Sequence, residues 1–217
     1  MPLTDAQIER YSRQIIVPHF GSRAQERLLG ARIVFAARRE DLDPPLAYLV
    51  GAGVGGIYLD YDTARVNINI NELAAAMRAL NPDSVVAAFA SDDCSRVAPD
   101  LCVAIIGDAA SLSSARALCA NLAHVPSLVA RLDSPAQIGI FPAPPPCAIC
   151  SNSILAKPFG QRSPDAGLIA MAATAEAFKL LAGYDAAPRA ALIEFHGYDS
   201  RVHQPTRDLN CACASAA

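Results

Sequence analysis

Tryptophan is absent from this chain of 217 residues, and charged residues make up only 18% of it. With a net charge of −3 and no basic stripe, the chain lacks the positive surface that binding to nucleic acid requires. No apolar run approaches the length of about 18 residues that spans a membrane. The N-terminus also lacks a basic segment followed by an apolar one, so we expect no signal peptide and a cytoplasmic protein.

Apolar residues make up 53% of the chain, enough to bury one good core. Short apolar runs alternate with helical patterns, which predicts an α/β fold with a mostly parallel sheet and helices on both faces. The expected strands are 32–37, 57–61, 84–89, 101–106, 127–131, 138–141, 191–195 and 201–204. The expected helices are 5–16, 24–29, 44–50, 72–80, a helix capped by Ser111 or Ser113 that runs to about 123, and 166–181.

We expect a single domain over residues 1–217. Residues 1–30 form an N-terminal helical arm, and residues 31–135 form the parallel α/β half. Residues 136–217 contain a crossover segment, two cysteine pairs and a C-terminal β extension.

Two close pairs stand out among the seven cysteines. Cys147 and Cys150 have the spacing Cys-x-x-Cys, and Cys211 and Cys213 have the spacing Cys-x-Cys. Four thiolates in two close pairs with a long separation are typical of a closed, tetrahedral zinc site. The alternatives are a disordered tail with free thiols, or replacement of one ligand by His196 or His203.

The segment Gly51-Ala-Gly-Val-Gly-Gly56 matches the dinucleotide-binding pattern Gly-x-Gly-x-x-Gly. A true phosphate-binding loop follows a strand and begins a helix. This segment instead precedes the strand-like run Ile57–Asp60, and we therefore interpret it as a turn between a helix and a strand.

Several motifs occur in an order that resembles the ThiF/MoeB/HesA family, whose members adenylate ubiquitin-like and sulfur-carrier proteins. These motifs are Arg10-Tyr11-Ser12-Arg13-Gln14, Ala52-Gly53-Val54-Gly55, Leu59-Asp60-Tyr61-Asp62, Leu80-Asn81-Pro82 and Gly107-Asp108, followed by the two cysteine pairs. The resemblance implies a Rossmann-like fold, a structural zinc ion that holds the C-terminal extension, a dimer, and a site for ATP and magnesium.

The resemblance also implies roles for individual residues. Asp108 matches the catalytic aspartate that binds magnesium, and Asp60 matches the acid that binds the ribose, with Asp62 beside it in the ATP site. Arg13 matches an arginine that reaches across the dimer to ATP.

The sequence departs from the family pattern where the phosphates of ATP should bind. The family has a glycine loop after its first strand, whereas this chain has Ala36-Ala37-Arg38-Arg39-Glu40-Asp41. Non-glycine residues resist positive φ angles, and Glu40 and Asp41 would repel a triphosphate. The family's phosphate-binding arginine is missing from residues 67–70 and its lysine from residues 71–76. The segment that follows Cys150 contains no cysteine, so no thioester nucleophile is available there.

These losses favour a scaffold that has kept the fold and the zinc but has lost adenylation. Such a chain would bind a ubiquitin-like or sulfur-carrier protein, or would form a homodimer or a heterodimer with an active paralogue. The first alternative is an active adenylyltransferase that uses Asp108, Asp60 and Arg13, with Arg38 or Arg39 in place of the missing cations. The second is a nucleotide cleft that now binds a different small molecule.

Overall fold

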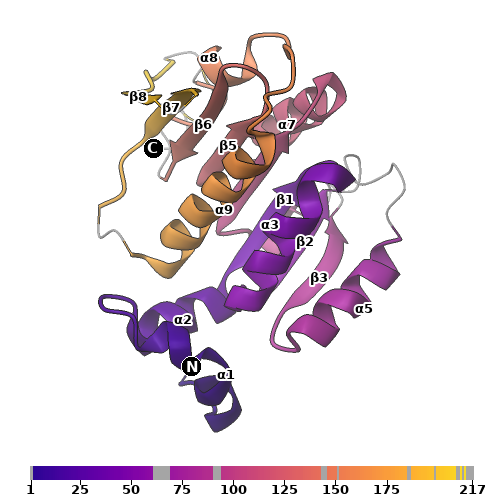
Figure 1. Cartoon of the computed structure of the whole chain (residues 1–217), viewed down its shortest axis with the longest axis vertical. Helices are drawn as coiled ribbons and strands as arrows, with labels where there is room; N and C mark the ends of the chain where they lie inside the picture. Colours follow the sequence, from indigo (N-terminus) through magenta and orange to yellow (C-terminus); the bar gives the residue numbers. More distant parts are fainter. Residues whose placement is uncertain are drawn as a thin grey trace.

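One sheet of eight strands runs through the protein (Figure 1). The computed structural model describes residues 2–60, 69–89, 94–142, 146–150, 152–184, 187–197, 199–208, 211 and 213. The spatial order of the strands is β3-β2-β1-β4-β5-β6-β7-β8. The strands are β1 (Arg32–Ala36), β2 (Gly56–Asp60), β3 (Val85–Phe89), β4 (Leu101–Ile106), β5 (Ser127–Arg131), β6 (Ala136–Phe141), β7 (Ala191–His196) and β8 (Asp199–His203).

The first five strands are parallel, and the last three join by antiparallel pairing. The chain moves outward from β1 through β2 to β3, and then returns to place β4 on the other side of β1. The strand order therefore reverses between β1 and β4, and in open α/β sheets ligands bind at the carboxyl ends of the strands at such a point. The predicted α/β class, with a mostly parallel Rossmann-like sheet and a C-terminal β extension, is confirmed.

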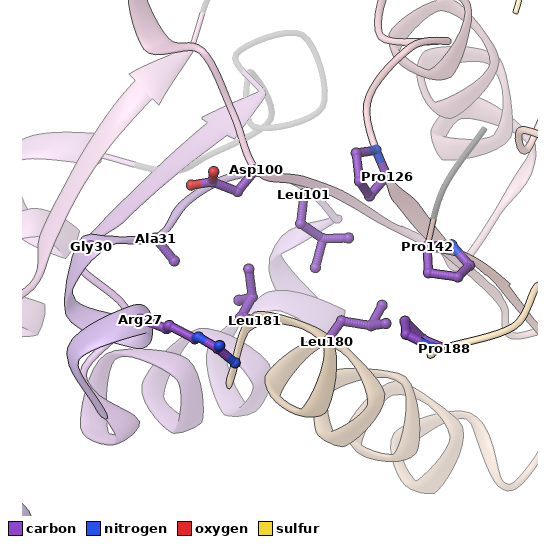
Figure 2. A pocket seen from close by; sticks show the side chains of 10 residues that line it. All are labelled: Arg27, Gly30, Ala31, Asp100, Leu101, Pro126, Pro142, Leu180, Leu181 and Pro188. Atoms are coloured by element: carbon purple, nitrogen blue, oxygen red, sulfur yellow. The ribbon is translucent and has the colours of Figure 1, made fainter. Parts of the chain in front are cut away.

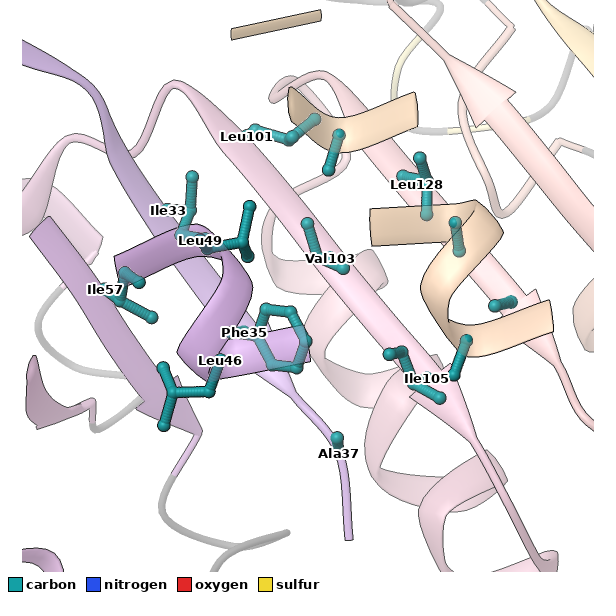
Figure 3. Packing of buried hydrophobic residues seen from close by; sticks show 14 of the residues in the cluster. Ile33, Phe35, Ala37, Leu46, Leu49, Ile57, Leu101, Val103, Ile105 and Leu128 are labelled. Carbon is teal, nitrogen blue, oxygen red and sulfur yellow. The ribbon is translucent and has the colours of Figure 1, made fainter. Parts of the chain in front are cut away.

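Helices cover both faces of this sheet, as the continuous apolar runs in the strands require. The helices are α1 (Asp5–Ile15), α2 (Gly21–Gly30), α3 (Arg39–Ala52), α5 (Ile70–Leu80), α6 (Cys94–Val97), α7 (Ala109–Asn121), α8 (Asn152–Leu155) and α9 (Ala166–Ala182). Ile33 and Phe35 of β1 face the core beneath α3 and α9 (Figure 3), whereas Val34 and Ala36 face the core beneath α7. None of the described helices is long and apolar enough to cross a membrane.

The N-terminal arm is fixed to the sheet by a buried polar contact. Tyr11 of α1 is 1% exposed, and its hydroxyl donates to Asp83 Oδ2 at 3.0 Å. The Asn81 amide donates to the Tyr11 hydroxyl at 2.9 Å and to the Val50 carbonyl at 2.7 Å. Burial raises the pKa of Tyr11 to about 12, so the hydroxyl keeps its proton. Two of the motifs that are distant in sequence thus lock together, with Tyr11 from the first and Asn81 from the fourth.

The glycine-rich segment after α3 is a turn from a helix into a strand, as predicted. Gly53 caps α3 in the left-handed region, with φ at 88°. The Gly55 amide donates to the Leu28 carbonyl at 2.9 Å, and a Cβ atom at Gly55 would lie 2.0 Å from the Leu29 carbonyl oxygen. Glycine is required at position 55 because the backbone of the N-terminal arm lies so close to it. This packing explains the glycine without a phosphate-binding role.

The helix predicted over residues 44–50 is longer than expected, because α3 begins at Arg39. Pro44 and Pro45 therefore lie inside the helix rather than in its first turn. Because proline has no backbone N–H group, the helix loses two hydrogen-bond donors at these positions. The strand predicted over residues 201–204 also begins earlier, at Asp199. Asp108 caps α7 rather than Ser111 or Ser113.

Candidate functional site

The carboxyl ends of β1, β2 and β4 bring three of the predicted positions to one edge of the sheet. Asp60 is the last residue of β2, Arg38 follows β1, and Asp108 follows β4 after Gly107. Asp62 lies outside the described residues. Asp60 and Asp108 lie on either side of the end of β1. The family resemblance implies that both belong to one ATP site, which would require this placement.

Both carboxylate oxygens of Asp108 are already bonded within the chain. Oδ1 accepts from the Ser111 amide and from the Ser111 hydroxyl, each at 2.8 Å, which makes Asp108 the N-cap of α7. Oδ2 lies 2.5 Å from Arg38 Nη1. Burial raises the pKa of this carboxyl, but the bonds from Ser111 and Arg38 outweigh it and lower the pKa overall. A magnesium ion would have to displace Arg38 from Asp108.

The connection from β1 to α3 contains only Ala37 and Arg38. Arg38 is the N-cap of α3 in an extended conformation, with φ at −74° and ψ at 160°, and its side chain makes no capping hydrogen bond. The positive end of the helix dipole meets the carboxylates of the first turn, Glu40 and Asp41. The short loop therefore neutralises its own helix end.

A second ion pair lies at the same edge of the sheet and joins α3 to the crossover segment. Asp41 of α3 is 2% exposed in its side chain, and it forms a two-pronged contact with Arg162 of the crossover segment. One prong joins Arg162 Nη1 to Asp41 Oδ2 at 3.2 Å, and the same Nη1 donates to the Gly107 carbonyl at 3.4 Å. A Cβ atom at Gly107 would lie 2.1 Å from Asp41 Oδ2, so glycine is needed for this contact.

The crossover segment that carries Arg162 is itself held to the sheet. Arg131 and Asp133, which are 3% and 5% exposed, form a buried pair with Nε–Oδ1 at 2.9 Å. The Arg131 guanidinium also donates to the backbone carbonyls of Ile154, Lys157 and Pro158, each within 3.0 Å. The Gly160 amide donates to Asp133 at 2.8 Å. These contacts fix the backbone on which Arg162 sits.

The side chains at this edge do not fit the triphosphate and magnesium that the resemblance implies. Arg38, Arg39 and Arg162 face the carboxylates of Glu40, Asp41, Asp43 and Asp108, so the group carries one net negative charge. Each of the three arginines is paired with a carboxylate. Phosphate binding depends on free donors and positive charge, and the described arginines at this edge face carboxylates of the same chain instead.

Arg13 lies far from this group along the fold. It is exposed in the last turn of α1, and α1 packs on α2, which leads into the amino end of β1. Asp108 and Asp60 lie at the carboxyl ends of the strands. Within one chain the structure therefore does not bring Arg13 to the other predicted residues.

The four paired cysteines converge as the sequence predicts. The Sγ atoms of Cys147, Cys150, Cys211 and Cys213 all lie within 4.8 Å of one another. The closest pairs are Cys150–Cys213 at 3.2 Å and Cys147–Cys211 at 3.5 Å, and Cys147–Cys150 is 3.8 Å. Sulfur ligands of a tetrahedral metal ion stand about 3.8 Å apart, given metal–sulfur bonds of about 2.3 Å. The cluster can hold one metal ion.

The two histidines considered as alternative ligands are not part of this cluster. His196 Nε2 instead lies 2.6 Å from Glu194 Oε1. The tight Cys-x-Cys spacing is therefore compatible with a four-sulfur site.

No protein-family model matches the chain. It is 27% identical to the adenylyltransferase and sulfurtransferase uba4 of Emericella nidulans, in an alignment of 266 residues that covers 99% of this chain and 54% of that protein. The uba4 protein of Pyricularia oryzae is 42% identical over 67 residues, or 30% of this chain and 14% of that protein. The chain thus spans about half the length of the Emericella relative.

Solved structures with the same fold include MccB of E. coli, with a TM-score of 0.66 and 16% identity over 97% of this chain and 73% of MccB. PaaA has a TM-score of 0.61 and 14% identity over 94% of this chain and 75% of PaaA. MccB has also been solved with ATP. At these identities the likeness establishes the fold.

The Arg38–Asp108 pair leads to a prediction about stability and pH. Asp108→Asn keeps an N-cap acceptor but loses the charge pair, and we expect it to lower the free energy of unfolding by up to about 1 kcal/mol at pH 7. The pKa of Asp108 is lowered in the folded state, so its contribution is complete above its ordinary value near 3.8. The difference from wild type should therefore shrink as the pH falls below that value.

Urea denaturation between pH 3 and pH 7 measures this difference. Asp165→Asn is the matched control, because Asp165 caps α9 without a side-chain capping bond and its loss should change stability by less than about 0.5 kcal/mol. A difference for Asp108→Asn that stays constant down to pH 3 would contradict the assignment.

Proposed function

We propose that this chain, a homologue of the ThiF/MoeB/HesA adenylating proteins through its relation to uba4, is a non-catalytic scaffold of a sulfur-carrier or ubiquitin-like protein system. The observation that carries the proposal is the internal pairing of Arg38 with Asp108 and of Arg162 with Asp41. Adenylyl transfer depends on positioning and charge neutralisation of phosphates. Side chains that neutralise one another cannot perform that task unless both pairs break.

Breaking the Asp41 pair is costly because the carboxylate is buried. Removing one partner of a buried ion pair leaves an uncompensated charge, at a cost of about 3–5 kcal/mol. Arg162 itself is exposed, with 40% of its side chain accessible to solvent, which reduces that cost. The binding energy of ATP would have to offset this cost, without contacts from the glycine loop, arginine and lysine of the family pattern.

An apolar groove next to this edge suits the tail of a carrier protein. It has a volume of about 520 Å³ and lies between the crossover segment, the start of α9 and the end of β7. Its lining includes Pro135, Pro164, Leu168, Ile169 and Phe195. Leu168 is 69% exposed and lines the groove, so it offers an apolar contact to a bound tail. Peptides bind to protein surfaces in part by placing side chains in pockets or apolar grooves.

Dimerisation is part of the proposal. An exposed aromatic group lies over α3 and α9, where Tyr48 is 44% exposed and its ring lies 6.1 Å from that of Phe178. Phe178 in turn stacks on Phe20 at 5.6 Å. A second copy or an active paralogue would bury Tyr48 and the exposed part of Phe178, and Arg13 would be available to that partner's site.

The competing function, adenylation, has one observation in its favour. Arg38 lies beside Asp108, where a cation replacing the missing lysine or arginine would be needed. ATP–pyrophosphate exchange stimulated by a carrier, and abolished by Asp108→Asn, would establish this function in place of the scaffold.

The groove provides the direct test of the scaffold function. Purified sulfur-carrier and ubiquitin-like proteins from the source organism are titrated against this chain without ATP. We expect one of them to bind, and Leu168→Glu to weaken its binding at least tenfold, which corresponds to about 1.4 kcal/mol.

Leu80→Glu is the matched control, because Leu80 is 50% exposed on α5, away from the groove. It should leave the affinity unchanged. If none of these carriers binds, or if both variants bind as wild type does, the scaffold function is wrong.

We also propose that the four-cysteine cluster holds zinc in a structural role. Four thiolates leave no open coordination position, so the ion would join the crossover region to the C-terminal tail without taking part in chemistry. Cys147 and Cys150 come from the crossover region, and Cys211 and Cys213 come from the tail.

Metal analysis of the purified protein should give one zinc ion per chain. Cys150→Ser should lose the metal, and a strong chelator should lower the melting temperature of the wild type. Cys119→Ala is the control, because Cys119 is buried in α7 outside the cluster and its variant should retain one zinc ion. Full zinc content in Cys150→Ser would contradict the assignment.

A further inference from the structure

A second cavity lies at the opposite edge of the sheet from Asp108 (Figure 2). Its volume is about 370 Å³. Ala31 precedes β1, Leu101 begins β4 and Pro126 precedes β5, so the cavity sits at the amino ends of three parallel strands. The end of α9 forms the opposite wall. The proposed scaffold function assigns no role to this cavity.

Leucine and proline side chains form the apolar part of the cavity's lining. Leu101, Leu180 and Leu181 contribute side chains, and Pro126, Pro142 and Pro188 line the same space (Figure 2). Proline has no backbone N–H group and a fixed φ angle, so these positions add shape without adding donors. Such a lining favours an apolar ligand body over a sugar or a base.

Two charged side chains stand at the cavity, and both are held by backbone contacts. Arg27 Nη1 donates to the Ala182 carbonyl at 3.4 Å, at the end of α9. Asp100 Oδ2 accepts from the Arg32 amide at 2.8 Å. Among the described residues, no carboxylate lies within ion-pair distance of Arg27. A guanidinium has five donors, so Arg27 has N–H groups left for an anion.

We propose that this cavity binds a small amphipathic molecule with an apolar body and one carboxylate group. The apolar body would lie against Leu101, Leu180 and Leu181, and the carboxylate would bind Arg27. Arg27 is a single cation, and Asp100 repels additional negative charge. The same pair of side chains therefore favours a ligand with one negative charge over a phosphorylated or polyanionic one.

Gly30 offers a way to fill the cavity without disturbing the fold. It lines the cavity at the end of α2, and a Cβ atom there would meet no heavy atom within 4 Å. A leucine at this position would extend into the space that the ligand uses. Gly51 of α3 has equally open surroundings but does not line the cavity, so it provides the matched position.

Isothermal titration of the full chain with octanoate tests the proposal, with octanol as the uncharged probe. We expect saturable one-to-one binding of octanoate with a dissociation constant below about 1 mM. Arg27→Gln should weaken it at least tenfold, and Gly30→Leu should abolish it. Arg23→Gln, an exposed arginine of the same helix, and Gly51→Leu should bind octanoate as wild type does.

Binding of octanol as tight as that of octanoate, or unchanged octanoate affinity in Arg27→Gln, would overturn the carboxylate assignment. Absence of octanoate binding to wild type, or binding retained in Gly30→Leu, would overturn the site itself. Thermal denaturation of each variant shows whether it is folded at the temperature of the titration, so that a loss of binding is not caused by unfolding.

Discussion

The contact between Asp41 and Arg162 occupies the edge of the sheet between β1 and β4, where the strand order reverses and ligands bind in this fold class. It therefore limits which ligands can bind there. A carboxylate with 2% of its side chain exposed needs a cationic partner, and the crossover segment supplies one. That segment is fixed in turn by Arg131, whose guanidinium binds Asp133 and three backbone carbonyls. Gly107 leaves the room that the pair occupies. Four elements therefore meet at the edge where this fold class binds its ligands.

The neighbouring Arg38–Asp108 pair has the same consequence at the start of α7. An aspartate that caps a helix and binds an arginine is engaged at both oxygens. The acid suggested by the family resemblance thus has a structural use that requires no metal. The fold and the cysteine cluster do not depend on a phosphate site, because other residues stabilise them: Tyr11 and Asn81 hold the arm, and the four cysteines bring the tail to the crossover region.

Most of the fold could be predicted from the sequence, because apolar runs and turn residues report local structure directly. The predicted strands from β1 to β5 match the observed ones to within one residue. The start of α3 was missed because Pro44 suggested a first turn. The pairing of Asp41 with Arg162 joins residues separated by 121 positions, and no local pattern predicts such a contact. The four cysteines were predicted because their spacing itself indicates a metal site.

Isothermal titration calorimetry with ATP and magnesium tests most directly whether the internal ion pairs stand where the phosphates of ATP would bind. The Emericella uba4 protein, measured under the same conditions, serves as the comparison. We expect no saturable heat for this chain at ATP concentrations up to about 1 mM, which corresponds to a binding free energy weaker than about −4 kcal/mol. Micromolar binding of ATP and magnesium, reduced by Asp108→Asn, would contradict it.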